Sequence, residues 1–218
     1  MRPIHTLTLA AMVAGAAAFA QTGSSDTSSR ASTSSAAAMG PTAVLSLLQQ
    51  VDRDEIRLAN IAQSKATSDK VKDYARDMIK DHGDLDKELN EFATQNKLML
   101  GASHLPSAKR TELISMVQDA ERRLTSATGA QFDREYMQTM SQSHAKALSD
   151  LDAVMPAFKD KKDQNKVYDL VKSARDKVED HKKHADDVLK DLARETATGG
   201  SGTSGSSTSH PNPGGTGR

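Results

Sequence analysis

The sequence predicts an all-α protein: a bundle of four long helices, with a short additional helix connecting the second to the third. Only 3% of the 218 residues are aromatic. The core must therefore be built from Leu, Val, Ala, Met and Ile, a combination that favours packed helices over a β-sandwich. In the central part of the chain, apolar residues recur at alternating spacings of three and four, which is typical of helices that pack along a shallow-angle seam. Most glycines lie outside this central part.

The N-terminus predicts export. Met1-Arg2 supplies a positive start, and Leu7 to Phe19 form an apolar stretch that ends in small residues, which is the pattern of a signal peptide cleaved after Ala20. This stretch is shorter than the roughly 20 residues of a membrane-spanning helix. We therefore expect no integral membrane span after signal cleavage, and a periplasmic or secreted location.

Two polar segments flank the expected bundle. Residues 21–40 are rich in Ser, Thr and Ala, and residues 196–218 are rich in Gly, Ser and Thr. Both contain too little apolar surface to offset the entropy lost on ordering, so we expect a disordered linker and a disordered tail. The signal peptide then occupies residues 1–20, and the helical bundle occupies residues 41–195.

The individual helices follow from their apolar stripes and from the residues at their ends. The first begins behind Gly40-Pro41, because proline is favoured in a first helical turn, and Thr67-Ser68 offer a cap for the second. The connecting segment follows a break at residues 101–106. At about 1.5 Å per residue it is long enough to carry the chain along the bundle, which leaves the direction of the third long helix open. The helices are expected over 42–66, 68–97, 107–127, 130–158 and 162–195.

Each of the four long stripes is interrupted once, near the middle of its helix, by an ionisable residue. Because helix midpoints coincide in parallel and antiparallel packing, these side chains are expected to meet in one layer of the core. Three imidazoles and a carboxylate are a sufficient ligand set for a single Fe, Zn or Mn ion, and nearby Met78 and Met140 would suit Cu. The candidate metal ligands are Glu55, His82, His144 and His181.

Several neighbours of these residues have candidate roles of their own. Asp81 and Glu179 lie beside the stripes and are candidates to orient the imidazoles. His184 lies one turn beyond His181 and is an alternative ligand, although at this position a solvent-exposed histidine is expected. Met78 and Met140 are expected to fill gaps in the core rather than to bind an ion.

A structural interpretation of the polar layer stands beside the metal interpretation. Buried polar residues at single seam positions often fix helix register, and Glu55 would then simply be hydrogen-bonded to a histidine. Under that interpretation the chain is a non-enzymatic envelope or stress protein, which forms a homo-oligomer or binds an envelope protein. Under the metal interpretation it serves envelope metal or oxidative-stress handling, and the sequence leaves open whether it is an enzyme.

Composition and motifs exclude other classes of function. Lys plus Arg and Asp plus Glu number 29 each, so the chain has no excess positive charge for nucleic acid. It contains no cysteine, which excludes disulfides, thiolate metal sites and cysteine nucleophiles. The central part shows no glycine-rich phosphate loop, no dinucleotide fingerprint and no nucleophilic-serine turn.

Short motifs carry a resemblance to a known family. Met78-Ile79-Lys80-Asp81-His82, Phe132-Asp133-Arg134-Glu135-Tyr136, Gln142-Ser143-His144 and the helix of His181 occur in this order. Over about residues 42–194 the chain resembles the exported bacterial family called domain of unknown function 4142.

The resemblance implies a ferritin-like bundle in which segment 107–127 is the crossover, and it implies no established activity. The chain departs from the di-iron ferritin pattern, which needs Glu-x-x-His on two helices. The residues three positions before His82 and His181 are Ile79 and Val178. Ferroxidase activity therefore does not carry over, and a mononuclear or a purely structural layer remains.

Overall fold

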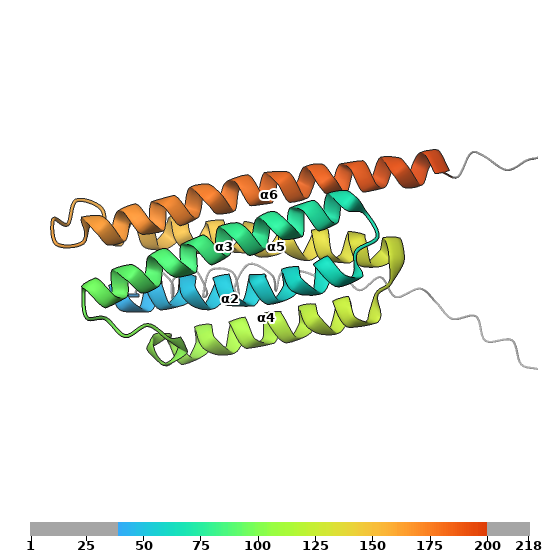
Figure 1. Ribbon diagram of the computed structural model, residues 1–218. Coiled ribbons are helices and arrows are strands. Elements are labelled where there is room, and N and C mark those ends of the chain that lie inside the picture. Colours follow the sequence, from blue (N-terminus) through green and yellow to red (C-terminus); the bar gives the residue numbers. More distant parts are fainter. Residues whose placement is uncertain (1–38, 200–218) are drawn as a thin grey trace, which may run out of the picture.

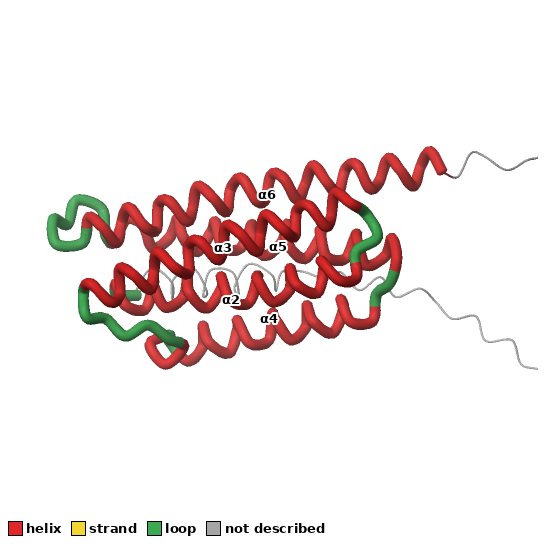
Figure 2. Tube along the Cα trace, viewed as in Figure 1, coloured by secondary structure: helices red, strands yellow, loops and turns green. Residues whose placement is uncertain are grey.

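The computed structural model describes residues 39–199, and these residues form a helical bundle (Figures 1 and 2). The expected signal peptide, most of the expected linker and the tail from residue 200 onward lie outside the described residues. Within residues 39–199 there is no strand, and no helix is long and apolar enough to cross a membrane. The helices are α2 (Pro41–Lys65), α3 (Asp69–Gln95), α4 (Ser107–Ser126), α5 (Gly129–Val154) and α6 (Asn165–Gly199), with 3-10 turns at Ala102–His104 and Met155–Ala157.

The order of the helices confirms the four-helix bundle with a connecting helix. α2 packs against α3, and α5 packs against α6, as two antiparallel pairs. α4 runs along α2 and α5 and carries the chain from the end of α3 back to the other end of the bundle (Figure 1). This crossover makes α5 run parallel to α3, which settles the direction of the third long helix.

The helix boundaries differ from the expected ones mainly between α5 and α6 and at the end of α6. The third long helix ends at Val154 rather than at residue 158, because Pro156 has no N–H to continue the α-helical ladder, and a 3-10 turn follows. Asp160 then takes a left-handed conformation in the following turn, and α6 starts at Asn165. At its other end α6 continues to Gly199, so residues 196–199, which were expected to belong to the tail, are helical.

The core consists of two apolar clusters, and every residue of the four expected stripes is buried or half-buried. One cluster surrounds Tyr74, Phe132 and Tyr136, near the α2–α3 turn. The other surrounds Leu45 and Phe158, towards the opposite end of the bundle. The polar residues of the four stripes lie in sequence between these clusters, so the clusters enclose the polar layer from both sides.

The connecting helix is held by charged contacts at both ends. Near its start, the buried Lys109 ammonium lies 2.6 Å from Asp150 of α5. Near its end, Lys65 of α2 donates to the carbonyls of Leu124 and Thr125, where a cation is favoured by the unsatisfied carbonyls of a helix C-terminus. These contacts fix α4 against both helix pairs.

Asp133 of α5 caps the N-terminus of α3 from outside that helix. Its carboxylate is buried and accepts hydrogen bonds from the backbone N–H groups of Thr67 and Ser68, both at 2.9 Å, and from the Thr67 hydroxyl. The Ser68 side chain itself makes no capping hydrogen bond. The cap therefore links the two helix pairs.

We expect Asp133→Ala to lower the free energy of unfolding by about 2 kcal/mol, because it removes a charged acceptor from two backbone donors. Urea unfolding monitored by circular dichroism measures this change. Asp180→Ala removes an exposed aspartate from α6 and should change stability by less than about 0.5 kcal/mol. Equal effects of the two substitutions would contradict a capping role.

Candidate metal centre

The four ionisable residues that interrupt the stripes lie together in the bundle interior, as the sequence predicts. Glu55 comes from α2, His82 from α3, His144 from α5 and His181 from α6, and all four are buried. The ring centroids of the three histidines lie 5.2–6.1 Å apart. One nitrogen of each ring lies within 4.8 Å of the corresponding nitrogens of the other two, a grouping that could hold a metal ion.

Glu55 joins this group through one carboxylate oxygen. Its Oε2 atom lies 2.8 Å from Nε2 of His82 and 3.2 Å from Nε2 of His144. Its other oxygen, Oε1, accepts a hydrogen bond of 2.8 Å from the Ser143 hydroxyl. The carboxylate is therefore oriented from one side and presents its second oxygen to the imidazoles.

Each imidazole is fixed through the nitrogen that faces away from the centre. Nδ1 of His82 donates to Asp52 at 2.8 Å, and Nδ1 of His144 donates to the carbonyl of Met140 at 2.7 Å. Because a carbonyl only accepts, His144 carries a proton on Nδ1, and its Nε2 is the nitrogen that faces Glu55. The histidines thus receive the kind of outer partner that orients metal-bound imidazoles.

His181 is oriented in the opposite sense. Its Nε2 lies 3.1 Å from Asp81, and its Nδ1 is the nitrogen left without a partner. Asp81 therefore has the orienting position that the sequence predicts for it. Lys177 also contacts Asp81, at 3.2 Å, and holds this carboxylate at the edge of the bundle.

The inward-facing atoms have no hydrogen-bond partner. Among residues 39–199, the buried side-chain atoms without one include Oε2 of Glu55, Nε2 of His82, Nε2 of His144 and Nδ1 of His181. The contacts of Glu55 with His82 and His144 are short, but they do not have the direction of an N–H···O bond. Since buried polar atoms in native proteins are nearly always paired, four such atoms in one place require an explanation.

The charged groups of the layer shift one another's pKa values. Burial lowers the pKa of His82, but the Glu55 and Asp52 carboxylates outweigh this effect and raise it to about 10. Burial raises the pKa of Glu55, but the neighbouring His144 and His82 hold it well below its usual value. Without an ion, the layer therefore contains a negative Glu55 beside a positive His82.

The pKa values of a second histidine and a second carboxylate in the layer shift in the opposite directions to those of His82 and Glu55. Burial lowers the pKa of His181 to about 4, against the effect of its hydrogen bond to Asp81. Burial also raises the pKa of Asp52 to about 6, although its hydrogen bond with His82 opposes this shift. His181 is therefore uncharged at pH 7, which is the form in which an imidazole can bind a metal ion.

Some accessory expectations are corrected. Glu179 does not orient a histidine, because it is exposed and pairs with Arg175 one turn earlier on the same helix. His184 is exposed, as expected, and its ring contacts the edge of Tyr74 rather than joining the layer. Met78 and Met140 are buried in the apolar cluster around Tyr74 and fill the core there.

Two contributors to the layer were missed in the sequence. Asp52 lies one turn before Glu55 and is buried against His82, and Ser143 directly precedes His144 and contacts Glu55. The signal for Asp52 was its spacing of three from Glu55, which places both carboxylates on one face of α2. Ser143 gave no comparable signal.

Comparisons with known proteins identify one family and one solved structure. The family model described as "Domain of unknown function (DUF4142)" matches residues 26–188. The crystal structure of a putative secreted protein DUF305 from Streptomyces coelicolor is similar, with a TM-score of 0.55 and 12% identity over 71% of this chain and 94% of that chain. At this identity the likeness shows the fold alone. Among curated proteins, no significant match was found.

We expect the metal-free protein to lose stability as the pH rises from 6.5 to 10. The folded pKa of His82, about 10, lies above the ordinary value of 6.5, so its contribution is fully present below pH 6.5 and is lost as the pH passes through 10. The measurement is the unfolding free energy of the wild type minus that of His82→Gln, in the presence of chelator. A difference that stays constant or increases over this range would contradict the coupling.

Proposed function

Since the chain belongs to the family described as domain of unknown function 4142, a description that assigns no activity, we propose a function from the geometry: the polar layer binds one divalent transition-metal ion. The ligands are the three histidines His82, His144 and His181 together with Glu55. We propose this as a mononuclear site, because the chain lacks the paired Glu-x-x-His motifs of di-iron bundles.

One observation carries the proposal. Each of the four residues has one buried atom without a hydrogen-bond partner, and each fixes its other polar atom with a hydrogen bond. The ligand nitrogens of the three histidines lie within 4.8 Å of one another, and Oε2 of Glu55 lies beside those of His82 and His144. An ion would satisfy all four atoms at once.

The donor set limits the ions that suit the site. Three imidazole nitrogens and one carboxylate oxygen suit Zn²⁺, Fe²⁺, Mn²⁺ or Cu²⁺ rather than Ca²⁺ or Mg²⁺, which prefer all-oxygen sites. Around a tetrahedral ion at about 2.0–2.1 Å from each donor, donors lie roughly 3.3 Å apart. The histidine nitrogens are within 4.8 Å of one another, so binding draws the rings together by side-chain rotation.

We place this function outside the cytoplasm. The support is the N-terminal pattern of Met1-Arg2 followed by the apolar stretch Leu7 to Phe19, and the description of the structural neighbour as a secreted protein. In the envelope, a buried single-ion site would serve metal storage, metal sensing or protection against oxidants.

The second candidate is a metal-free layer that fixes register in a non-enzymatic interaction protein. The 2.8 Å contact between Glu55 and His82 favours it, because a buried ion pair can specify how helices meet. The two candidates differ in the effect of His82→Leu. His82→Leu alone would leave the Glu55 carboxylate buried and unpaired, so we combine it with Glu55→Leu. If the layer binds no ion, this double variant should keep or raise the free energy of unfolding.

We expect the purified protein to bind one Zn²⁺ ion per chain, and His144→Ala to weaken binding by more than roughly a hundredfold because one of four ligands is lost. Elemental analysis after dialysis and competition with a chromogenic chelator measure stoichiometry and affinity. His184→Ala is the matched control, since His184 is exposed and lies outside the layer. Metal binding that is unaffected by His144→Ala would overturn the proposal.

We expect Asp81→Ala to weaken metal binding by about tenfold to a hundredfold without changing the one-to-one stoichiometry, because His181 loses the partner that orients it. The same competition assay applies. Asp84→Ala, on the same helix and paired with Lys80 at the surface, should leave affinity within about twofold. If the two variants behaved alike, Asp81 would have no orienting role.

A further inference from the structure

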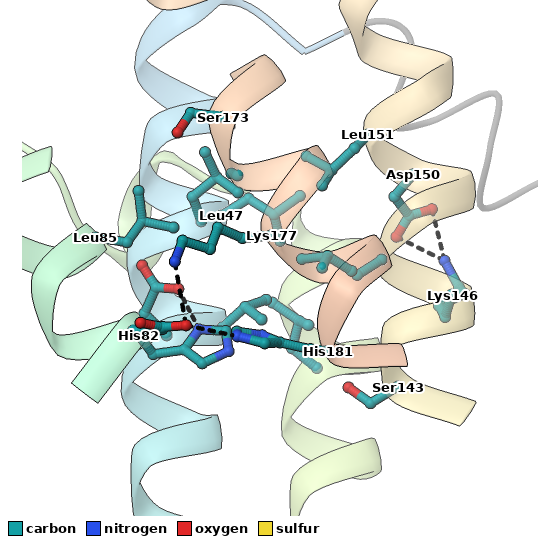
Figure 3. A pocket seen from close by; sticks show the side chains of 18 of the residues that line it. Leu47, His82, Leu85, Ser143, Lys146, Asp150, Leu151, Ser173, Lys177 and His181 are labelled. Atoms are coloured by element: carbon teal, nitrogen blue, oxygen red, sulfur yellow. Dashed lines mark hydrogen bonds and ion pairs between the residues drawn. The ribbon is translucent and has the colours of Figure 1, made fainter. Parts of the chain in front are cut away.

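A cavity of about 210 Å³ adjoins the polar layer on the side of the Leu45–Phe158 cluster. Figure 3 shows His82 and His181 close together at one end of this cavity, with Leu47, Leu85 and Leu151 further along it. The helices of both pairs and the connecting helix α4 contribute to its walls. Two of the proposed metal ligands, His82 and His181, therefore form one end of the cavity.

The cavity arises from one underfilled layer of the core. One step along each stripe from the polar residues stand Val51, Leu85, Ala147 and Val178, and all four line the cavity. Three of them, Val51, Leu85 and Ala147, are only half-buried although they occupy core positions of the stripes. Side chains of this size do not close the space between four helices, and an unfilled space of this kind lowers stability in proportion to its volume.

The cavity presents mainly apolar surface, and its charged lining residues are paired except for Glu88, which is exposed to solvent. Lys109 and Lys146 both contact Asp150, at 2.6 and 2.7 Å. At the other side Lys177 contacts Asp81 at 3.2 Å, and Lys80 contacts Asp84 at 3.0 Å. An ion that entered the cavity would lose its hydration without gaining a buried, unpaired counter-charge, so the cavity favours a neutral guest.

We propose that this cavity is a binding site for a small neutral molecule of one ring or two fused rings. Its apolar body lies against Val51, Leu85, Ala147 and Val178, and a polar group, where the molecule has one, faces His82 and His181. A dry apolar cavity of about 150 Å³ in another protein is large enough for benzene. The site adjoins the proposed metal centre but does not depend on a bound ion.

Indole is a suitable probe, because the chain contains no tryptophan and the fluorescence of indole can be excited without that background. Titration of the purified protein with indole should show saturable binding to one site. Ala147→Leu places a larger side chain in the cavity and should weaken binding by at least about tenfold. Ala145→Leu, an exposed position on the same helix, should leave it unchanged.

Two further arms separate this proposal from others. Glu55→Gln, which removes a proposed metal ligand, should retain indole binding, so the cavity and the metal site can fail independently. Benzoate and benzylammonium, which carry a charge on a single ring, should bind at least about tenfold more weakly than indole.

Methyl resonances provide a second measurement if Ala147→Leu impairs folding. On addition of indole to the wild-type protein, the largest shifts should occur at Val51, Leu85 and Val178. Absence of saturable binding, equal effects of Ala147→Leu and Ala145→Leu, or shifts located away from these three residues would each overturn the proposal.

Discussion

The structure depends on the burial of four ionisable side chains in one layer of an otherwise apolar core. Moving a charge from water into a protein interior is costly unless the charge is paired and hydrogen-bonded. The molecule meets this constraint with outer partners: Asp52 for His82, the Met140 carbonyl for His144, and Asp81 for His181. These partners leave the inner atoms of the layer facing one another, and this is the feature on which the proposed metal site rests.

The layer also explains how the two helix pairs are joined. Glu55 and His82 belong to the α2–α3 pair, whereas His144 and His181 belong to the α5–α6 pair. Contacts within each pair are far more extensive than contacts between the pairs. An ion held by all four residues would cross-link the halves of the bundle at its centre, in addition to the Asp133 cap and the charged contacts of α4. Binding and folding stability would then be linked.

The sequence was sufficient for the helices and for the four stripe residues of the layer, but not for Asp52 and Ser143. All five helices were predicted, because long apolar stripes of period three and four determine which face is buried. Glu55, His82, His144 and His181 were found because each is the one polar interruption of its stripe. The orienting role predicted for Glu179 was wrong, because the partner of an exposed charge depends on local geometry that sequence spacing does not reveal. The cavity could not be predicted either, since it depends on how four stripes fit together and not on any one of them.

The most direct test of a metal centre is X-ray absorption spectroscopy of the zinc-loaded protein at the zinc edge. The account requires nitrogen and oxygen donors at about 2.0–2.1 Å and the multiple-scattering pattern of three imidazoles. A first shell without imidazoles, made of water oxygens or containing sulfur from a methionine, would contradict the assignment of the layer as a metal site.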